Sequence, residues 1–334
     1  MIAENRLEGV AKLPGPGLWT TSVGSFPKPD YITKARARFA RKEIDREVLR
    51  ELERKATREW IEFQDSIDTD LVVDGEQYRG DMVAFFAEEL PGFEIGGLVR
   101  SYGNRYYRKP IATGPIRRDA PLTVDWWEYA QSLTKKPVKG MLTGPYTICD
   151  WSFNEHYPSR RDFVLDLAKV IRDEALDLER AGARYIQIDE PAASTRMDEL
   201  DLVIEAMAIV TEPLTAHTIT HICYGDFHNA YPKMLDIPVD QIDLEFANSE
   251  YSLLEDFSDH PFSKYIGLGV TDVHSHELEP VDEIVEGIRR SLKHIPPERM
   301  FVDPDCGLKT RTVDEAKAQL ANIKKAVDVV RAEL

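Results

Sequence analysis

Residues 217–223 read HTITHIC, a short run that ends in two side chains able to bind a metal ion. His221 and Cys223 are two positions apart, so on an extended strand both point to the same side. Two further metal-binding side chains, Glu245 and Cys306, also come at or just after the end of a short apolar run. Parallel α/β barrels gather the carboxyl ends of their strands on one face, where active sites lie. The stretch therefore indicates a barrel that holds a metal at this face.

Eight runs of this kind follow one another along the chain. They are short and apolar with few alternating polar residues, which is typical of strands covered on both faces. We expect strands over Leu18–Phe26, Asp70–Gly75, Val138–Thr143, Arg184–Asp189, His217–Cys223, Ile242–Glu245, Tyr265–Asp272 and Arg299–Cys306.

Helical patterns separate most of these expected strands. Lys42–Ile67 is long and charged, with apolar residues at helical spacing. Ser159–Arg180 opens with S-x-x-D and Thr312–Leu334 opens with T-x-x-E, both typical of a capped helix start. Repeated alternation of strand and helix predicts an α/β protein with a (β/α)8 TIM barrel.

One segment is longer than a barrel unit requires. The chain between the second and third strands is too long for a single helix, and about 91–119 is rich in Gly, Tyr and Arg. This composition predicts a hairpin-like insertion after strand 2. No linker is long or polar enough to divide the chain, so we expect a single domain over 1–334.

Composition limits the partners and the compartment. The 334 residues carry a net charge of -17, which argues against a nucleic-acid partner because phosphate binding needs basic patches. No apolar stretch approaches the roughly 20 residues that a membrane span requires, and the start of the chain lacks the apolar segment of a signal peptide. Three widely spaced cysteines form no disulfide framework. We expect a cytoplasmic enzyme whose thiols are free to bind metal.

The four metal-binding side chains have a spacing that suits a barrel. Cys223, Glu245 and Cys306 are separated by whole strand–helix units, and no C-x2-C pair of a structural zinc knuckle is present. Two sulfurs, an imidazole and a carboxylate suit zinc. The alternative is that the two cysteines and His221 are buried core residues, as lone examples usually are. Cys149 has no matching partner, and we interpret it as a packing residue.

Other strand ends carry ionisable groups. Glu76 and Asp189 could bind the ammonium group of an amino-acid substrate, although salt bridges to nearby Arg and Lys would explain them equally well. His274 could move a proton near neutral pH. Trp151 offers a flat surface for a planar ligand, but aromatic residues after a strand more often pack in the core.

Several motifs together resemble a known family, the catalytic C-terminal half of cobalamin-independent methionine synthase. The likeness covers about 20–334 and is closest to the short, single-barrel members. The motifs that carry it, in chain order, are VGSFPKP, DGEQYRGDMVAFF, SYGNRYYRKP, VKGMLTGPYTICDWSF, IQIDEPA, THICYGDF, GVTDVHS and VDPDCGLKTR.

The resemblance implies a role for each part of the site. It assigns a zinc cofactor to His221, Cys223, Glu245 and Cys306. It places the amino group of the homocysteine substrate between Glu76 and Asp189, and the homocysteine carboxylate near the backbone of Gly24 and Ser25. It makes His274 a candidate proton relay, and it places Arg105 and Trp151 beside the methyl donor. If the donor is a folate, His274 or Asp272 could deliver the proton to its leaving nitrogen through water. The implied reaction is methyl transfer to the homocysteine thiol, which forms methionine.

Departures from the family pattern bear on the donor. Folate-using relatives read IDEPALRE, whereas this chain reads IDEPAAST and has Thr195 where the last Glu helps to hold the pterin. The loss of this donor position favours a methylated corrinoid, either methylcobalamin or a corrinoid protein, over methyltetrahydrofolate. Alternatives are a methyltransferase of the same fold that uses 5-methyltetrahydrofolate or acts on another thiol such as coenzyme M. The least favoured reading is a non-enzymatic binding subunit stabilised by zinc.

Overall fold

The fold is of the parallel α/β barrel class. A computed structural model describes residues 13, 15, 17–100, 106–223, 225 and 227–334. The parallel strands follow one another in the order β1-β10-β9-β8-β7-β6-β4. Their bounds are β1 Trp19–Thr20, β4 Gly140–Thr143, β6 Tyr185–Asp189, β7 His217–Ile222, β8 Gln241–Leu244, β9 Tyr265–Gly269 and β10 Met300–Asp303.

The second expected strand, Asp70–Gly75, is reduced to an isolated parallel bridge between Val72 and Val138. The backbone N–H of Leu71 donates to Thr20 O at 3.0 Å, and the N–H of Val72 donates to Pro137 O at 3.0 Å. This segment therefore lies between β1 and the residues that lead into β4. With it the (β/α)8 pattern predicted from the sequence is confirmed, although this member pairs over too few residues to form a named strand.

Ten α-helices are present among the described residues, and most follow a strand of the barrel. Their bounds are α2 Asp30–Ala40, α3 Arg46–Ser66, α4 Met82–Glu89, α5 Val124–Ser132, α6 Pro145–Asp150, α7 Arg160–Ala181, α8 Leu200–Thr211, α9 Phe227–Ala230, α10 Val281–Ser291 and α11 Val313–Arg331. The predicted capped starts are confirmed: the Ser159 hydroxyl accepts from the N–H of Asp162, and Thr312 and Glu315 form a capping box before α11. No helix of the described part of the chain is both long and apolar enough to cross a membrane.

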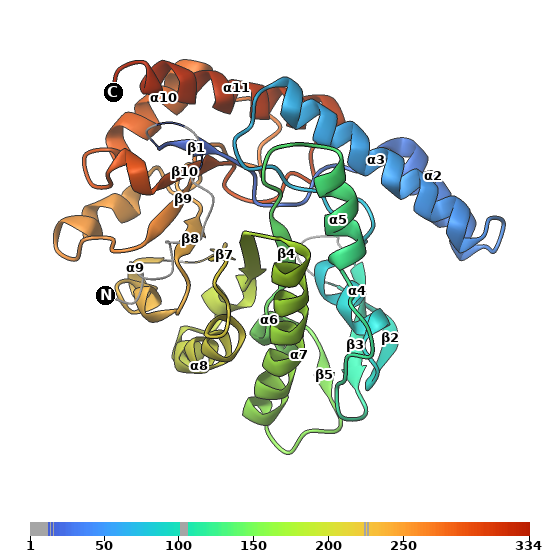
Figure 1. The fold of residues 1–334 in the computed structure, drawn as a ribbon. Helices are drawn as coiled ribbons and strands as arrows, with labels where there is room; N and C mark the ends of the chain where they lie inside the picture. The colour runs from blue at the N-terminus through green and yellow to red at the C-terminus, as the bar shows by residue number, and fades with distance from the viewer. Residues whose placement is uncertain (1–12, 14, 16, 101–105, 224, 226) are drawn as a thin grey trace. The chain divides into compact units, whose positions relative to one another are not determined.

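The described chain divides into two compact units, and the prediction of one domain over 1–334 stays a prediction. The first unit contains 79–125 and 140–240. In it β4, β6 and β7 pair in parallel, and α7 packs beside α8 (Figure 1). The buried faces of these two helices are mostly apolar, with Leu167, Ile171, Val203 and Met207 fully buried.

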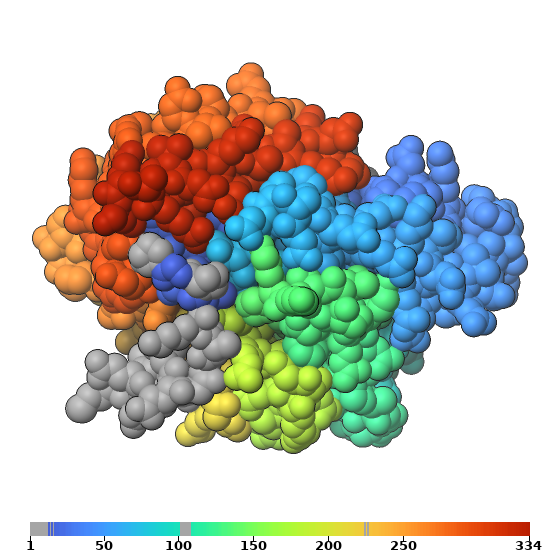
Figure 2. Space-filling model, turned by 45° about the horizontal axis from the view of Figure 1, so that its top comes forward, coloured from blue at the N-terminus to red at the C-terminus, as the bar shows by residue number. Residues whose placement is uncertain are grey.

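The second unit contains 11–78, 126–139 and 241–334. In it β8, β9, β10 and β1 pair in parallel, and α10 packs beside α11. Figure 2 shows α2 and α3 of this unit, in blue, on the molecular surface. The inner side of α3 buries Trp60 and Ile61 together with the polar residues Glu53, Thr57 and Gln64.

Each unit uses the same threonine–aspartate pair at the start of a strand. The N–H and the hydroxyl of Thr20 both donate to Oδ2 of Asp70, and the N–H of Asp70 donates to the Thr20 hydroxyl. Thr218 and Asp240 repeat all three bonds at 2.8, 2.8 and 3.1 Å. Because all four residues are buried, these bonds satisfy polar groups that water does not reach.

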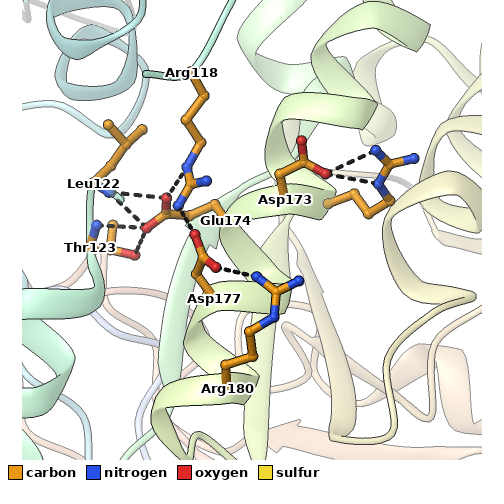
Figure 3. A network of polar contacts seen from close by, with 8 residues as sticks. Arg118, Leu122, Thr123, Asp173, Glu174, Asp177 and Arg180 are labelled. Atoms are coloured by element: carbon orange, nitrogen blue, oxygen red, sulfur yellow. Dashed lines mark hydrogen bonds and ion pairs between the residues drawn. The ribbon is translucent and has the colours of Figure 1, made fainter. Parts of the chain in front are cut away.

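The predicted insertion is a hairpin. β2 (Phe93–Arg100) and β3 (Tyr106–Ala112) pair antiparallel, and the two-residue strand β5 (Phe153–Asn154) joins β3. The chain after β3 is then held against α7 by Glu174, which is fully buried (Figure 3). The Glu174 carboxylate accepts from Arg118 Nε at 2.6 Å, from the N–H of Leu122 at 3.0 Å and from the N–H and hydroxyl of Thr123 at 2.7 Å.

Replacing Glu174 by Ala is expected to destabilise the protein by about 3 kcal/mol, because it leaves buried donors without an acceptor. The matched control is Asp173→Ala in the same helix. Asp173 is half exposed and pairs with the adjacent Arg172, so its loss should change stability by less than about 0.5 kcal/mol. Urea denaturation measures both, and equal losses would contradict this role for Glu174.

Candidate metal centre

His221 and Cys223 lie at the carboxyl end of β7. His221 is near the end of this strand and Cys223 directly follows its last residue, and both side chains are buried. The His221 carbonyl accepts from the N–H of Glu190 at 3.1 Å, which fixes the backbone here to the end of β6. The two side chains come from positions of the same parity on an extended segment, as expected from the sequence.

Glu245 and Cys306 lie at the ends of two other strands. Glu245 directly follows β8 and is buried, whereas Cys306 lies in the loop after β10 and is partly exposed. Oε1 of Glu245 is 3.9 Å from Nε2 of His274. This histidine follows β9, so the ends of two strands bring a carboxylate and an imidazole together.

Three of the four predicted ligands form a cluster. His221, Cys223 and Cys306 each offer one ligand atom, and these atoms all lie within 4.8 Å of one another. An imidazole nitrogen and two sulfurs are donors that bind a divalent metal of intermediate softness. Glu245 is outside this group as found among the described residues, and its part in binding the metal stays a prediction.

The predicted proton relay, Asp272 and His274, forms a tight turn after β9. Oδ1 of Asp272 accepts from the N–H of His274 at 2.7 Å, and the N–H of Asp272 donates to Glu279 Oε1 at 2.6 Å. The Asp272 carbonyl accepts from the guanidinium of Arg311. His274 is the more exposed of the two predicted relay residues, while its ring faces the buried Glu245. The carboxylate thus shapes the backbone that presents the imidazole.

Ser25 and Glu76 belong to neighbouring loops of the second unit. The Ser25 carbonyl accepts from the N–H of Leu308 at 2.8 Å, so the predicted substrate loop at Gly24 and Ser25 lies against the loop that contains Cys306. Glu76 has a left-handed backbone with φ of 54°, and its N–H donates to Asp74 Oδ1 at 2.8 Å. A non-glycine residue in this region is uncommon and is often found where a side chain has a special task.

Asp189 is the last residue of β6 and Glu190 directly follows it, and the two side chains bind different partners. Oδ1 of Asp189 accepts from Gln187 Nε2 at 2.7 Å. Glu190 is fully buried and accepts from the N–H groups of Tyr146 and Thr147 at 3.0 and 2.8 Å, at the start of α6. Burial raises the pKa of Glu190 to about 7, while these hydrogen bonds act in the opposite direction.

Glu190 and Asp305 are functional candidates that the sequence reasoning missed. Asp305 directly precedes Cys306, is fully buried, and accepts from three backbone N–H groups that follow Glu245. Burial raises the pKa of the Asp305 carboxyl to about 8, and the three donors lower it. The sequence did contain a signal for both residues. Glu190 follows the predicted substrate residue Asp189 in IDEP, and Asp305 precedes the predicted ligand Cys306 in DPDC.

The predicted donor residues are placed only in part. Trp151 is half-buried and caps α6, its N–H donating to Thr147 O at 3.0 Å. The adjacent Asp150 accepts from Arg160 Nη2 at 2.6 Å and from Arg196 Nε at 3.0 Å, which fixes the end of α6 to the loop after β6. Arg105 lies outside the described residues.

With the fold and the cluster in place, comparison with known proteins identifies the class. The profile of the family described as "Cobalamin-independent synthase, Catalytic domain" matches residues 18–329. The chain belongs to this family, and the resemblance stated from the sequence motifs is confirmed.

Individual relatives agree with this assignment. The chain is 41% identical over 344 residues to the 5-methyltetrahydropteroyltriglutamate--homocysteine methyltransferase of Rhodococcus jostii (strain RHA1), which covers 99% of this chain and 46% of that protein. The enzyme of the same name from Mycobacterium leprae (strain TN) is 41% identical and is covered to 45%. The chain therefore spans less than half the length of these relatives.

A solved structure of similar length also matches. It is that of a B12-independent methionine synthase from Shewanella sp. W3-18-1 in complex with selenomethionine. The TM-score is 0.85 at 26% sequence identity, and the match covers 95% of this chain and 98% of that one.

The expectation of a corrinoid donor, methylcobalamin or a corrinoid protein, is wrong. The family is described as cobalamin-independent, and the relatives are named for a methyltetrahydropteroyltriglutamate donor. The expectation depended on Thr195 in place of a Glu. In the structure the Thr195 hydroxyl donates to Ala192 O at 2.9 Å within its own turn, so this residue serves the local backbone and carries no information about a corrinoid.

The three cysteines should differ in reactivity. Burial raises the pKa of the Cys149 thiol to about 12, so at about pH 8 almost none of it is the reactive thiolate. We expect iodoacetamide to leave Cys149 unmodified in the folded protein, and to modify the partly exposed Cys306 once a chelator is present. Peptide mass spectrometry measures both, and modification of Cys149 at the rate of Cys306 would contradict its interpretation as a packing residue.

Proposed function

We propose that this protein is a zinc-dependent methyltransferase that moves a methyl group from a 5-methyltetrahydropteroylglutamate to the thiol of homocysteine and so forms methionine. One observation carries the proposal: an imidazole and two thiols at strand ends have ligand atoms within 4.8 Å of one another, in a chain of the cobalamin-independent synthase family. The names of the relatives in that family support the choice of thiol and donor.

His221, Cys223 and Cys306 would hold the zinc ion, with Glu245 as a fourth ligand. Zinc at such a site supplies the acidity that converts a thiol, whose pKa is near 8.5 in water, into a nucleophilic thiolate at neutral pH. The chain would contribute the placement of these donors at the ends of its strands. Glu245 lies at the end of β8 and close to His274, so its carboxylate can bind either the zinc ion or the His274 imidazole.

The ammonium and carboxylate groups of homocysteine would be bound by acidic side chains and by backbone groups, respectively. Glu76 and Asp189 are buried carboxylates, and each offers an acceptor for the substrate ammonium group. The backbone near Gly24 and Ser25 would bind the substrate carboxylate. The fixed geometry of Glu76, with its left-handed backbone bonded to Asp74, reduces the entropy lost on binding.

The methyl donor would bind beside Trp151, and the expectation that Arg105 also contacts it stays a prediction. Its leaving nitrogen must gain a proton when the methyl group departs, and the His274 imidazole is a suitable source near neutral pH. Asp272 would keep this imidazole in place through the bond from its carboxylate to the His274 N–H.

The direct test is a methionine-formation assay with purified protein and homocysteine. We expect 5-methyltetrahydropteroyltriglutamate to support turnover and methylcobalamin to support little or none, with activity lost on chelation and regained with Zn2+. Coenzyme M in place of homocysteine should be inactive. Turnover that needs methylcobalamin, or a preference for coenzyme M, would refute the proposed donor or the proposed acceptor respectively.

The role proposed for Glu76 predicts a change in substrate affinity. Glu76→Gln removes one charged hydrogen bond to the ammonium group, worth about 1.5–3 kcal/mol, so the KM for homocysteine should rise about 10- to 100-fold. The analogue 4-mercaptobutanoate, which lacks the amino group, provides the control and should react equally poorly with both proteins. An unchanged KM for homocysteine would show that Glu76 does not bind the substrate.

A further inference from the structure

Asp305 occupies a built position at the ends of three strands. It lies in the loop after β10, directly before Cys306, and its side chain is fully buried. Its own N–H donates to the carbonyl of Thr271, just after β9, at 3.0 Å. The backbone next to Cys306 is therefore fixed to the neighbouring strand end.

The Asp305 carboxylate holds the backbone that follows Glu245. Oδ1 accepts from the N–H groups of Phe246 and Ala247 at 3.1 and 3.0 Å, and Oδ2 accepts from the N–H of Asn248 at 2.6 Å. These are the first three peptide groups after Glu245. Both oxygens of the Asp305 carboxyl group are used as acceptors.

A glycine makes room for this arrangement. A Cβ on Gly269, the last residue of β9, would come within 2.3 Å of Asp305 Oδ1 and 2.7 Å of the Leu244 carbonyl. No side chain fits between the carboxylate and the end of β8. The packing of Gly269 is thus matched to the buried carboxylate and to the backbone that leads into Glu245.

We propose that Asp305 is a positioning residue of the metal centre, which sets the carboxylate of Glu245 relative to the thiol of Cys306. The inference rests on the proposed function, because it gives Glu245 and Cys306 a shared metal. Asp305 touches neither the substrate nor the metal; it acts through the peptide groups that it binds. Outer hydrogen-bond partners of this kind orient ligands and affect how tightly a metal is bound.

The test compares Asp305→Asn with wild-type protein and with the control Asp314→Asn, an exposed aspartate in the first turn of α11. We expect Asp305→Asn to raise the dissociation constant for Zn2+ about 10- to 100-fold, and the control to leave it unchanged. With Co2+ as a probe, the thiolate-to-metal absorption should persist because both cysteines remain, whereas the d–d bands should shift because the carboxylate ligand has moved.

Two results would overturn the inference about Asp305 alone. The first is that Asp305→Asn binds Zn2+ as tightly as wild-type protein does, even if the melting temperature of the variant is lower. The other comes from hydrogen exchange, which does not depend on metal: the amides of Phe246, Ala247 and Asn248 should exchange more slowly in wild-type protein than in the variant, and equal rates would refute the contact. A wild-type protein that takes up no Zn2+ would instead refute the proposed function, and this inference with it.

Discussion

Two thiols and an imidazole with ligand atoms within 4.8 Å of one another are the constraint on which the rest of this site depends. Such groups gain little from contact with each other, and thiolates at this distance would repel. A cation among them removes that repulsion and deprotonates the thiols. A barrel fold allows these three side chains to come together, because residues more than 80 positions apart both lie at the carboxyl ends of strands, β7 and β10.

Buried acidic side chains accept hydrogen bonds that hold the segments at the ends of these strands. Asp70 and Asp240 each accept from the N–H and hydroxyl of a threonine in a neighbouring strand. Glu190 accepts from backbone N–H groups at the start of α6, and Asp305 accepts from those of the loop after β8. In each case a charge or a polar group removed from water is compensated by two or more donors, as burial requires. Of these contacts, those of Asp305 hold the backbone that directly follows the predicted ligand Glu245.

The sequence predicted what depends on local pattern. The strand–helix alternation, the caps at Ser159 and Thr312 and the hairpin after strand 2 are all confirmed. The segment Asp70–Gly75 was expected to be a full strand but pairs only at Val72, because strand length depends on neighbours that the sequence does not specify. Asp305 and Glu190 were missed for the same reason: their partners are 57–59 and 43–44 positions away. The expectation of a corrinoid donor was wrong because it depended on one substituted residue, Thr195, whose hydroxyl bonds only to the backbone of its own turn among the contacts described.

The central claim is that His221, Cys223 and Cys306 share one zinc ion. Zinc K-edge X-ray absorption on the purified protein tests it most directly. We expect one zinc per chain with two sulfur neighbours at about 2.3 Å and nitrogen or oxygen neighbours at about 2.0–2.2 Å. A spectrum with only nitrogen and oxygen neighbours, or a protein that binds zinc equally well after Cys223 and Cys306 are both replaced by Ser, would contradict it.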